Sequence, residues 1–175
     1  MYDKENIIRI SWFFNSFVNR IGFVACTVPR RKIHHRECNP NKVYPLLQNF
    51  AEWEKWSVWA SLDPNQKVSV TGEPGKPGHK QEWDGPINGK GSMTIDAAES
   101  NVFLKMNLVF EEPQPMVATS KFELKPEGTK TIVIWHNEGA LEYPIGRFFG
   151  LFLDSMLGKD FETGLAKLKE VVEKQ

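Results

Sequence analysis

With 175 residues, 41% of them hydrophobic, the chain is long enough to bury the core of one globular domain and too apolar to be disordered. Its 22 basic residues balance its 22 acidic ones, which argues against a general nucleic-acid surface. Cys26 and Cys38 are too few for a disulfide framework and lack metal-site spacing. We interpret them as free thiols in a reducing compartment and expect a cytoplasmic protein; one bridge in an oxidising compartment is the alternative.

Residues 1–28 are predicted to form an apolar helical extension of a ligand-binding domain at 29–175. Two arginines divide the extension into apolar runs well below the ~20 residues that cross a bilayer. We expect it to pack on the domain or on a second copy, as a homodimer contact. The alternative is a helix at a membrane interface, which would make the protein peripherally membrane-associated. The apolar stripe consists of Phe14, Phe17, Ile21, Val24 and Val28.

The next segment is predicted to hold a strand and several short helices at about 40–57. The strand spans 31–38, and Asn39 then suits the N-cap of a helix that begins at Pro40 and ends near Asn49. Three tryptophans follow at intervals of three residues, which places them on one side of a short helix or 3₁₀ turn. Such a trio either stacks on a ring-bearing ligand or plugs one end of a core, and we favour the plug. The trio is Trp53, Trp56 and Trp59.

From residue 66 the apolar pattern alternates with a period of two, which predicts strands. Turn signals rich in glycine and proline separate these strands, and no helical segment intervenes. Neighbouring strands are therefore expected to pair in an antiparallel meander. The expected strands span 66–73, 80–85, 89–100, 101–113, 115–128 and 129–142.

The end of the chain, 145–172, is predicted to form one long helix, because its apolar residues recur every three to five positions. Pro144 suits the first helical position, and Gly158 marks an expected kink or break. The apolar stripe consists of Ile145, Phe149, Phe152, Met156, Phe161, Leu165, Leu168 and Val172.

These elements predict an α+β fold: a curved antiparallel sheet of six to seven strands wrapped around the long C-terminal helix. A curved sheet with a single helix across it tends to leave space between the two layers. That space is the candidate binding site.

Four stretches carry a resemblance to a known family: NPNKVYPLLQNFAEWEKWSVWASLDP (39–64), GKGSMTI (89–95), TIVIWHNEG (131–139) and GKDFETGLAKLK (158–169). Through them the chain resembles the helix-grip superfamily, which includes START lipid-transfer domains, plant pathogenesis-related proteins and bacterial polyketide-cyclase-like proteins. The resemblance is strongest to the polyketide-cyclase-like branch, often called SRPBCC, and covers about 31–175. It implies a helix-grip fold that binds a hydrophobic ligand or lipid. Two departures are a short, unusually polar first strand and Asn137, which stands where the family often has Met.

Both faces of the last predicted strand carry apolar residues, so alternation alone does not choose the inward face. The family pattern places the face of Trp135 inward. Asn137 would then be a polar group among apolar walls, in need of a partner from protein, water or ligand. The candidate ligand-binding residues are Trp83, Met106, Leu108, Trp135, Asn137, Phe149, Phe152 and Met156.

The leading hypothesis is the binding or carriage of a small hydrophobic or amphipathic molecule. An enzyme of the cyclase or hydrolase type is the runner-up, and a partner-protein-binding module is a third class. An enzyme would need an inward-facing acid or base with a shifted pKa, such as His136, Glu138 or Glu82. We predict no catalytic residue, metal site or cofactor: a pair such as His136 and Glu138 is common on solvated strand faces, and His34 and His35 point to opposite faces of a strand.

Overall fold

The computed structural model describes the backbone of residues 24–35, 39–113, 115–128, 130–141 and 145–175. Side chains are described for residues 39–113, 115–128, 131–139 and 158–175. The predictions that fall on residues 1–23 lie outside the described residues.

In the described part of the chain, one strand is followed by short helices, then by a run of strands and a long final helix. This order matches the order of elements expected from the sequence. The elements are β1 (Val24–His35), α2 (Pro40–Gln48), η1 (Phe50–Lys55), α3 (Val58–Leu62), β2 (Lys67–Thr71), β3 (Lys80–Gly85), β4 (Gly89–Glu99), β5 (Phe103–Glu112), β6 (Met116–Glu127), β7 (Lys130–Leu141) and α4 (Ile145–Glu173).

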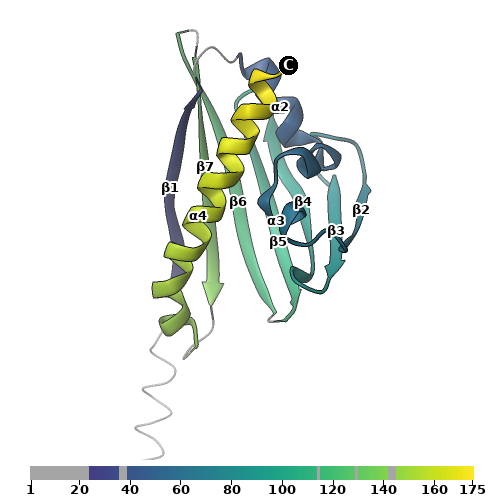
Figure 1. Cartoon of the computed structure of the whole chain (residues 1–175), viewed down its shortest axis with the longest axis vertical. Coiled ribbons are helices and arrows are strands. Elements are labelled where there is room, and N and C mark those ends of the chain that lie inside the picture. Colours follow the sequence, from purple (N-terminus) through teal and green to yellow (C-terminus); the bar gives the residue numbers. More distant parts are fainter. Residues whose placement is uncertain (1–23, 36–38, 114, 129, 142–144) are drawn as a thin grey trace, which may run out of the picture.

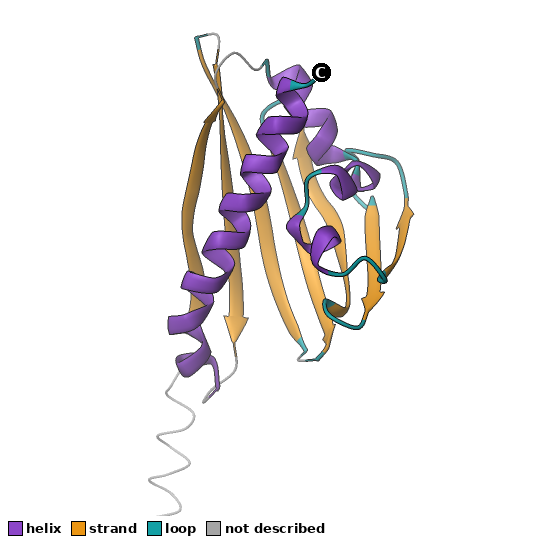
Figure 2. Cartoon of the chain, viewed as in Figure 1, coloured by secondary structure: helices purple, strands orange, loops and turns teal. Residues whose placement is uncertain are grey.

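The described strands form one seven-stranded antiparallel sheet in the order β1-β7-β6-β5-β4-β3-β2. Strands β2 to β7 are each paired with their neighbours in sequence, which confirms the meander. β1 is added at the far side by pairing with β7. The sheet forms one layer and the helices lie on one side of it (Figure 2), which confirms the predicted α+β fold.

Helix α4 crosses the sheet obliquely, from the ends of β1 and β7 to the neighbourhood of α2 (Figure 1). Its contacts are with β1, β7 and the short helices. The predicted long helix is confirmed, but it runs through Gly158 without the expected break. The glycine costs about 1 kcal/mol of helix propensity, and the buried apolar residues that follow it, Phe161, Leu165 and Leu168, offset that cost.

The short helices begin where their caps predict. The Asn39 side chain accepts a hydrogen bond from the backbone N–H of Asn41 at the start of α2. The Asn49 side chain does the same for Ala51 at the start of η1. Each cap satisfies one backbone donor that the first turn of a helix leaves without an internal acceptor.

The first strand differs from its prediction. β1 begins at Val24 and ends at His35, so Val24 and Val28 lie in a strand and not in the predicted helix. Residues four apart share a face in a helix and also in a strand, and Val28 precedes a proline that disfavours helix. That proline, Pro29, falls where the pairing with β7 shifts register, a position that edge strands tolerate.

Alternation along the strands divides the sheet into an inner face, covered by helices, and an outer face. On the inner side the second half of the α4 stripe is buried, as predicted, at Phe161, Leu165, Leu168 and Val172. It belongs to one core cluster with inner-face residues of the strands, which are also buried. These strand residues are Met93, Ile95, Leu104, Met106, Phe122, Leu124, Val133 and Trp135.

Asp63 joins the end of α3 to the turn between β3 and β4. The residue is 1% exposed, and its Oδ2 accepts hydrogen bonds from the backbone N–H groups of Ile87 (2.8 Å) and Asn88 (3.0 Å). Gly85 is required here, because a Cβ at that position would lie 2.4 Å from Asp63 Oδ2. One carboxylate therefore fixes the turn against the helical layer.

Replacing Asp63 with alanine should lower the free energy of unfolding by about 1.5–3 kcal/mol, the range for hydrogen bonds to a charged group. Urea denaturation measures this loss. Asp96→Ala is the matched control: Asp96 is exposed and its ion pair is with Lys105, so its loss should stay below about 1 kcal/mol. Equal losses in the two variants would contradict the role assigned to Asp63.

Candidate functional site

The tryptophan face of β7 points inward. Trp135 is 4% exposed, and its ring centroid lies 4.5 Å from those of Phe122 and Phe161. Its Nε1 donates a hydrogen bond to Oγ of the buried Ser120 (2.8 Å). The inward face expected from the family pattern is therefore confirmed, and Asn137, two residues farther along β7, shares it.

The tryptophan trio closes over Trp135 from the helical side. The ring centroids of Trp53, Trp56 and Trp59 lie 6.3, 5.9 and 5.9 Å from that of Trp135. Trp53 and Trp56 are buried, and each donates its indole N–H to a backbone carbonyl of α2. Because protein atoms satisfy these donors, Trp53 and Trp56 form a core plug, as predicted. Trp59 is partly buried and packs against the same core cluster.

Two of the predicted wall residues lie at the level of this plug. Met106 is fully buried, and Trp135 is surrounded by aromatic rings. Protein side chains therefore fill the space between the central strands and the second half of α4. A ligand would have to lie farther toward the turn between β5 and β6.

Toward that turn the inner face becomes half-buried while it stays apolar. Leu108 and Phe110 of β5 and Met116 of β6 are all partly exposed. Trp83 of β3 packs edge-on against Phe110, with ring centroids 5.7 Å apart. Its ring lies directly over Gly91, where an added Cβ would come within 2.5 Å of the indole. The structure thus brings two predicted residues, Trp83 and Leu108, to one apolar surface.

Asn137 stands between the packed and the half-buried parts of the inner face. Its β-sheet partners are Ser120 on β6 and Val28 on β1. The side chain of Asn137 is partly exposed. It is therefore a polar group on the face that carries the predicted site.

The other three predicted wall residues, Phe149, Phe152 and Met156, lie in the first half of α4. Their side chains lie outside the described residues, so their part in a site stays a prediction. The backbone of this half of α4 runs beside β1 and β7 (Figure 1).

Two inner-face polar residues of the β3 segment were missed by sequence reasoning. His79 is 1% exposed and stacks on Phe50; its Nε2 accepts from the Phe50 N–H, and its Nδ1 faces the Gly72 carbonyl at 3.2 Å. Both ring nitrogens therefore serve the fold. Gln81 is half-buried, and its buried Oε1 accepts no hydrogen bond among the described residues. Alternation around Trp83 would have placed both on the inner face.

Comparison with known proteins identifies the fold and the family. The sequence matches the family described as polyketide cyclase/dehydrase and lipid transport over residues 31–173. That range is well over half of the chain.

The chain belongs to this polyketide cyclase/dehydrase and lipid transport family. Family membership implies binding of a hydrophobic ligand in general terms and names no specific one. No curated protein matches the sequence.

Several solved structures share the fold of this chain at low sequence identity. A hypothetical protein of Helicobacter pylori has a TM-score of 0.61 and 12% identity, covering 86% of this chain and 88% of its own. A protein of Mesorhizobium loti has a TM-score of 0.58 and 16% identity, with coverages of 84% and 98%. The Aha1 dimer of Colwellia psychrerythraea has a TM-score of 0.58 and 16% identity, with coverages of 84% and 96%.

The acid–base candidates of the present chain face away from the predicted site. His136 and Glu138 alternate with the inward-facing Trp135, and the His136 Nε2 lies 3.7 Å from a carboxylate oxygen of Glu123. A hydrogen bond from Lys121 lowers the pKa of Glu123 from its ordinary value. His136, Glu123 and Lys121 are thus neighbours on the outer face of the sheet.

Glu82 belongs to the outer face as well. It alternates with the inward-facing Trp83 and accepts a hydrogen bond from Lys80 (2.6 Å), which lowers the pKa of its carboxyl. The shift therefore comes from a surface neighbour and not from a cavity. His34 and His35 of β1 pair with successive residues of β7, so they fall on opposite faces, as predicted.

Among the described residues, no group of three or more His, Cys, Asp and Glu side chains could hold a metal ion. Among the same residues, no helix is long and apolar enough to cross a bilayer.

Proposed function

We propose that the protein binds a small apolar or amphipathic molecule between the inner face of the sheet and the first half of α4. The observation that carries this proposal is the half-buried apolar surface formed by Trp83, Leu108, Phe110 and Met116. Removing such apolar surface from water contributes roughly 25 cal/mol of favourable free energy for each Å². A ligand with an apolar body would cover it.

The family supports the same proposal. Its description includes lipid transport and polyketide cyclisation or dehydration, all of which involve molecules with large apolar parts. The outward position of His136, Glu138 and Glu82 favours carriage over catalysis at those residues.

Asn137 would orient the ligand. An amide offers two donors and one acceptor, and it can bind a carbonyl or hydroxyl group at one end of an otherwise apolar molecule. Its place next to the packed aromatic cluster would fix that polar end while the apolar body extends toward Leu108.

Replacing Asn137 with leucine should weaken the binding of such a ligand by about 1–3 kcal/mol, because a polar ligand group would lose its partner. Titration with apolar fluorescent probes that carry a polar head, read through the emission of Trp83 and Trp135, measures the change. The fold should survive, since the family often has Met at this position.

Asn107→Leu is the matched control, because Asn107 is exposed and alternates with inner-face residues of β5. It should leave the affinity unchanged. Equal affinity of wild type and Asn137→Leu would remove Asn137 from the site. If no apolar probe binds the wild type, the carrier proposal is wrong.

A partner-binding module is the second candidate, and one observation favours it. Val109 and Val117 face each other across β5 and β6 on the outer face and are 40% and 62% exposed. Two valines make a small patch, whereas interaction sites usually span several hundred Å². The carrier proposal therefore ranks first.

A further inference from the structure

Gln81 lies on the face that we propose for the ligand, and one of its polar atoms has no partner within the described part of the chain. Its Oε1 is buried and accepts no hydrogen bond among the described residues. A buried polar group left unsatisfied lowers the stability of the folded protein. Native proteins carry few such groups, so each one calls for an explanation.

The position of Gln81 follows from the strand pattern. On β3 it stands two residues before Trp83, so the two side chains share the inner face. Its sheet partners are Val70 on β2 and Met93 on β4, and Met93 in turn pairs with Leu108. Gln81, Met93 and Leu108 therefore form one row across β3, β4 and β5 on the inner face. This row leads to the half-buried apolar surface.

The nearest inner-face polar group on the chain cannot supply the missing donor. Both nitrogens of His79 are engaged, with the Phe50 N–H and the Gly72 carbonyl. The flanking Lys80 and Glu82 bond to each other on the outer face. A donor for Gln81 Oε1 must therefore come from outside these neighbours.

We propose that Gln81 is a specificity-determining residue that accepts a hydrogen bond from a hydroxyl or N–H group of the ligand. The proposal rests on the ligand site proposed above and adds the chemical class of the ligand: an apolar molecule with a neutral hydrogen-bond donor. A carbonyl or ether oxygen has no proton to give to an acceptor, so it would leave Gln81 Oε1 unsatisfied.

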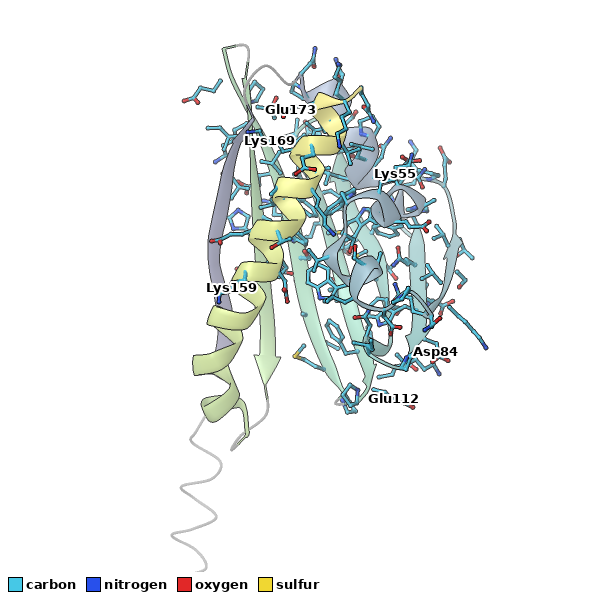
Figure 3. The ribbon with its side chains drawn as sticks, viewed as in Figure 1. Lys55, Asp84, Glu112, Lys159, Lys169 and Glu173 are labelled. Carbon is cyan, nitrogen blue, oxygen red and sulfur yellow. The ribbon has the colours of Figure 1, made fainter. Side chains whose placement is uncertain are left out.

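The exposed charges at this end of the sheet are of both signs. Asp84 and Glu112 are exposed at the end that carries the β5–β6 turn (Figure 3). Glu111, next to Glu112 in sequence, pairs with Lys90 and raises the pKa of its ammonium group, and Asp84 and Glu112 add to this effect. Because Lys90 lies among these carboxylates, surface charge does not select the class of ligand, which rests on the acceptor of Gln81.

Gln81 acts independently of Asn137. They lie on β3 and β7, four strand spacings apart in the sheet order, which corresponds to roughly 19 Å along the sheet at about 4.8 Å per spacing. Substitutions that far apart usually have additive effects. A change at Gln81 therefore tests the donor without disturbing the group that Asn137 would bind.

The test uses two probes of nearly the same shape, 2-naphthol and 2-methoxynaphthalene. The first has a hydroxyl donor, and in the second a methyl group replaces that proton. Quenching of tryptophan emission measures both affinities for the full chain at neutral pH. We expect the wild type to bind 2-naphthol about tenfold more tightly, in line with one buried hydrogen bond.

In Gln81→Met the preference should disappear, because methionine has a similar length and no strong acceptor. The melting temperature should stay the same or rise, since an unsatisfied buried group is replaced by an apolar one. Glu82→Met is the matched control: the neighbouring side chain lies on the outer face, and the tenfold preference should persist.

The outcomes separate the two proposals. If both probes bind the wild type with equal affinity, or if Gln81→Met keeps the preference, the role of Gln81 is wrong and the ligand site stands. If neither probe binds the wild type at any concentration reached, both the site and the role of Gln81 are overturned.

Discussion

Replacing Trp135 with alanine should lower the free energy of unfolding by about 3–5 kcal/mol, the range for removing a large aromatic side chain from a packed core. Trp135 is 4% exposed, and its ring contacts those of Phe122 and Phe161. The change also removes the donor to Ser120 Oγ, which leaves a buried hydroxyl without that bond. Urea denaturation followed by circular dichroism measures the loss.

Val117→Ala is the control for this experiment. Val117 lies on the outer face of the same sheet and is 62% exposed, so its loss should remain within about 0.5 kcal/mol. A loss below about 1 kcal/mol for Trp135→Ala would contradict a tightly packed aromatic cluster. The space between sheet and helix would then be open at the level where we place the plug.

The second large effect is expected in α4, where the proposed site and the packed core share one helix. Phe152→Ala should cost less than about 3 kcal/mol if Phe152 lines a ligand site, because part of the space around it is already open to ligand. The same change should weaken the binding of apolar probes. Denaturation and fluorescence titration of one protein preparation give both values.

Phe161→Ala is the matched comparison in the same helix. Phe161 is 6% exposed and packs on Trp135 and Trp59. Phe161→Ala should therefore lower the free energy of unfolding by about 3–5 kcal/mol, with no direct effect on the affinity for the probes. Equal losses at both positions would place Phe152 in a packed core. No measurable loss at Phe152 would mean that the first half of the stripe is not buried.

Local patterns determined most of the fold. A period of two from residue 66 onward predicted β2 to β7, and the strand bounds agree closely. Asn39 and Pro40 predicted the start of α2, because caps act through the backbone donors of a single turn. The apolar stripe predicted α4 for the same reason: contacts within one element have a fixed spacing in the sequence.

The site was predicted only in part. Sequence alternation put Trp83 and Leu108 on strand faces, and the family pattern supplied the inward direction of Trp135. The complete burial of Met106 could not be predicted from the sequence. It depends on tryptophans of the helical layer, which pack over the inner face of the sheet and belong to a distant part of the chain. Gln81 was missed for a related reason: a glutamine in a strand is ordinary until the structure shows that its acceptor is buried.

Where the sequence was compatible with two local structures, the tertiary structure decided between them. Val24 and Val28 fit one face of a helix and one face of a strand equally well, and pairing with β7 selected the strand. Gly158 could have ended α4, but burial of the apolar residues that follow it, such as Phe161 and Leu165, keeps the helix continuous. A glycine inside a helix costs about 1 kcal/mol, whereas burying each large apolar side chain beyond it contributes roughly 1.5–3 kcal/mol.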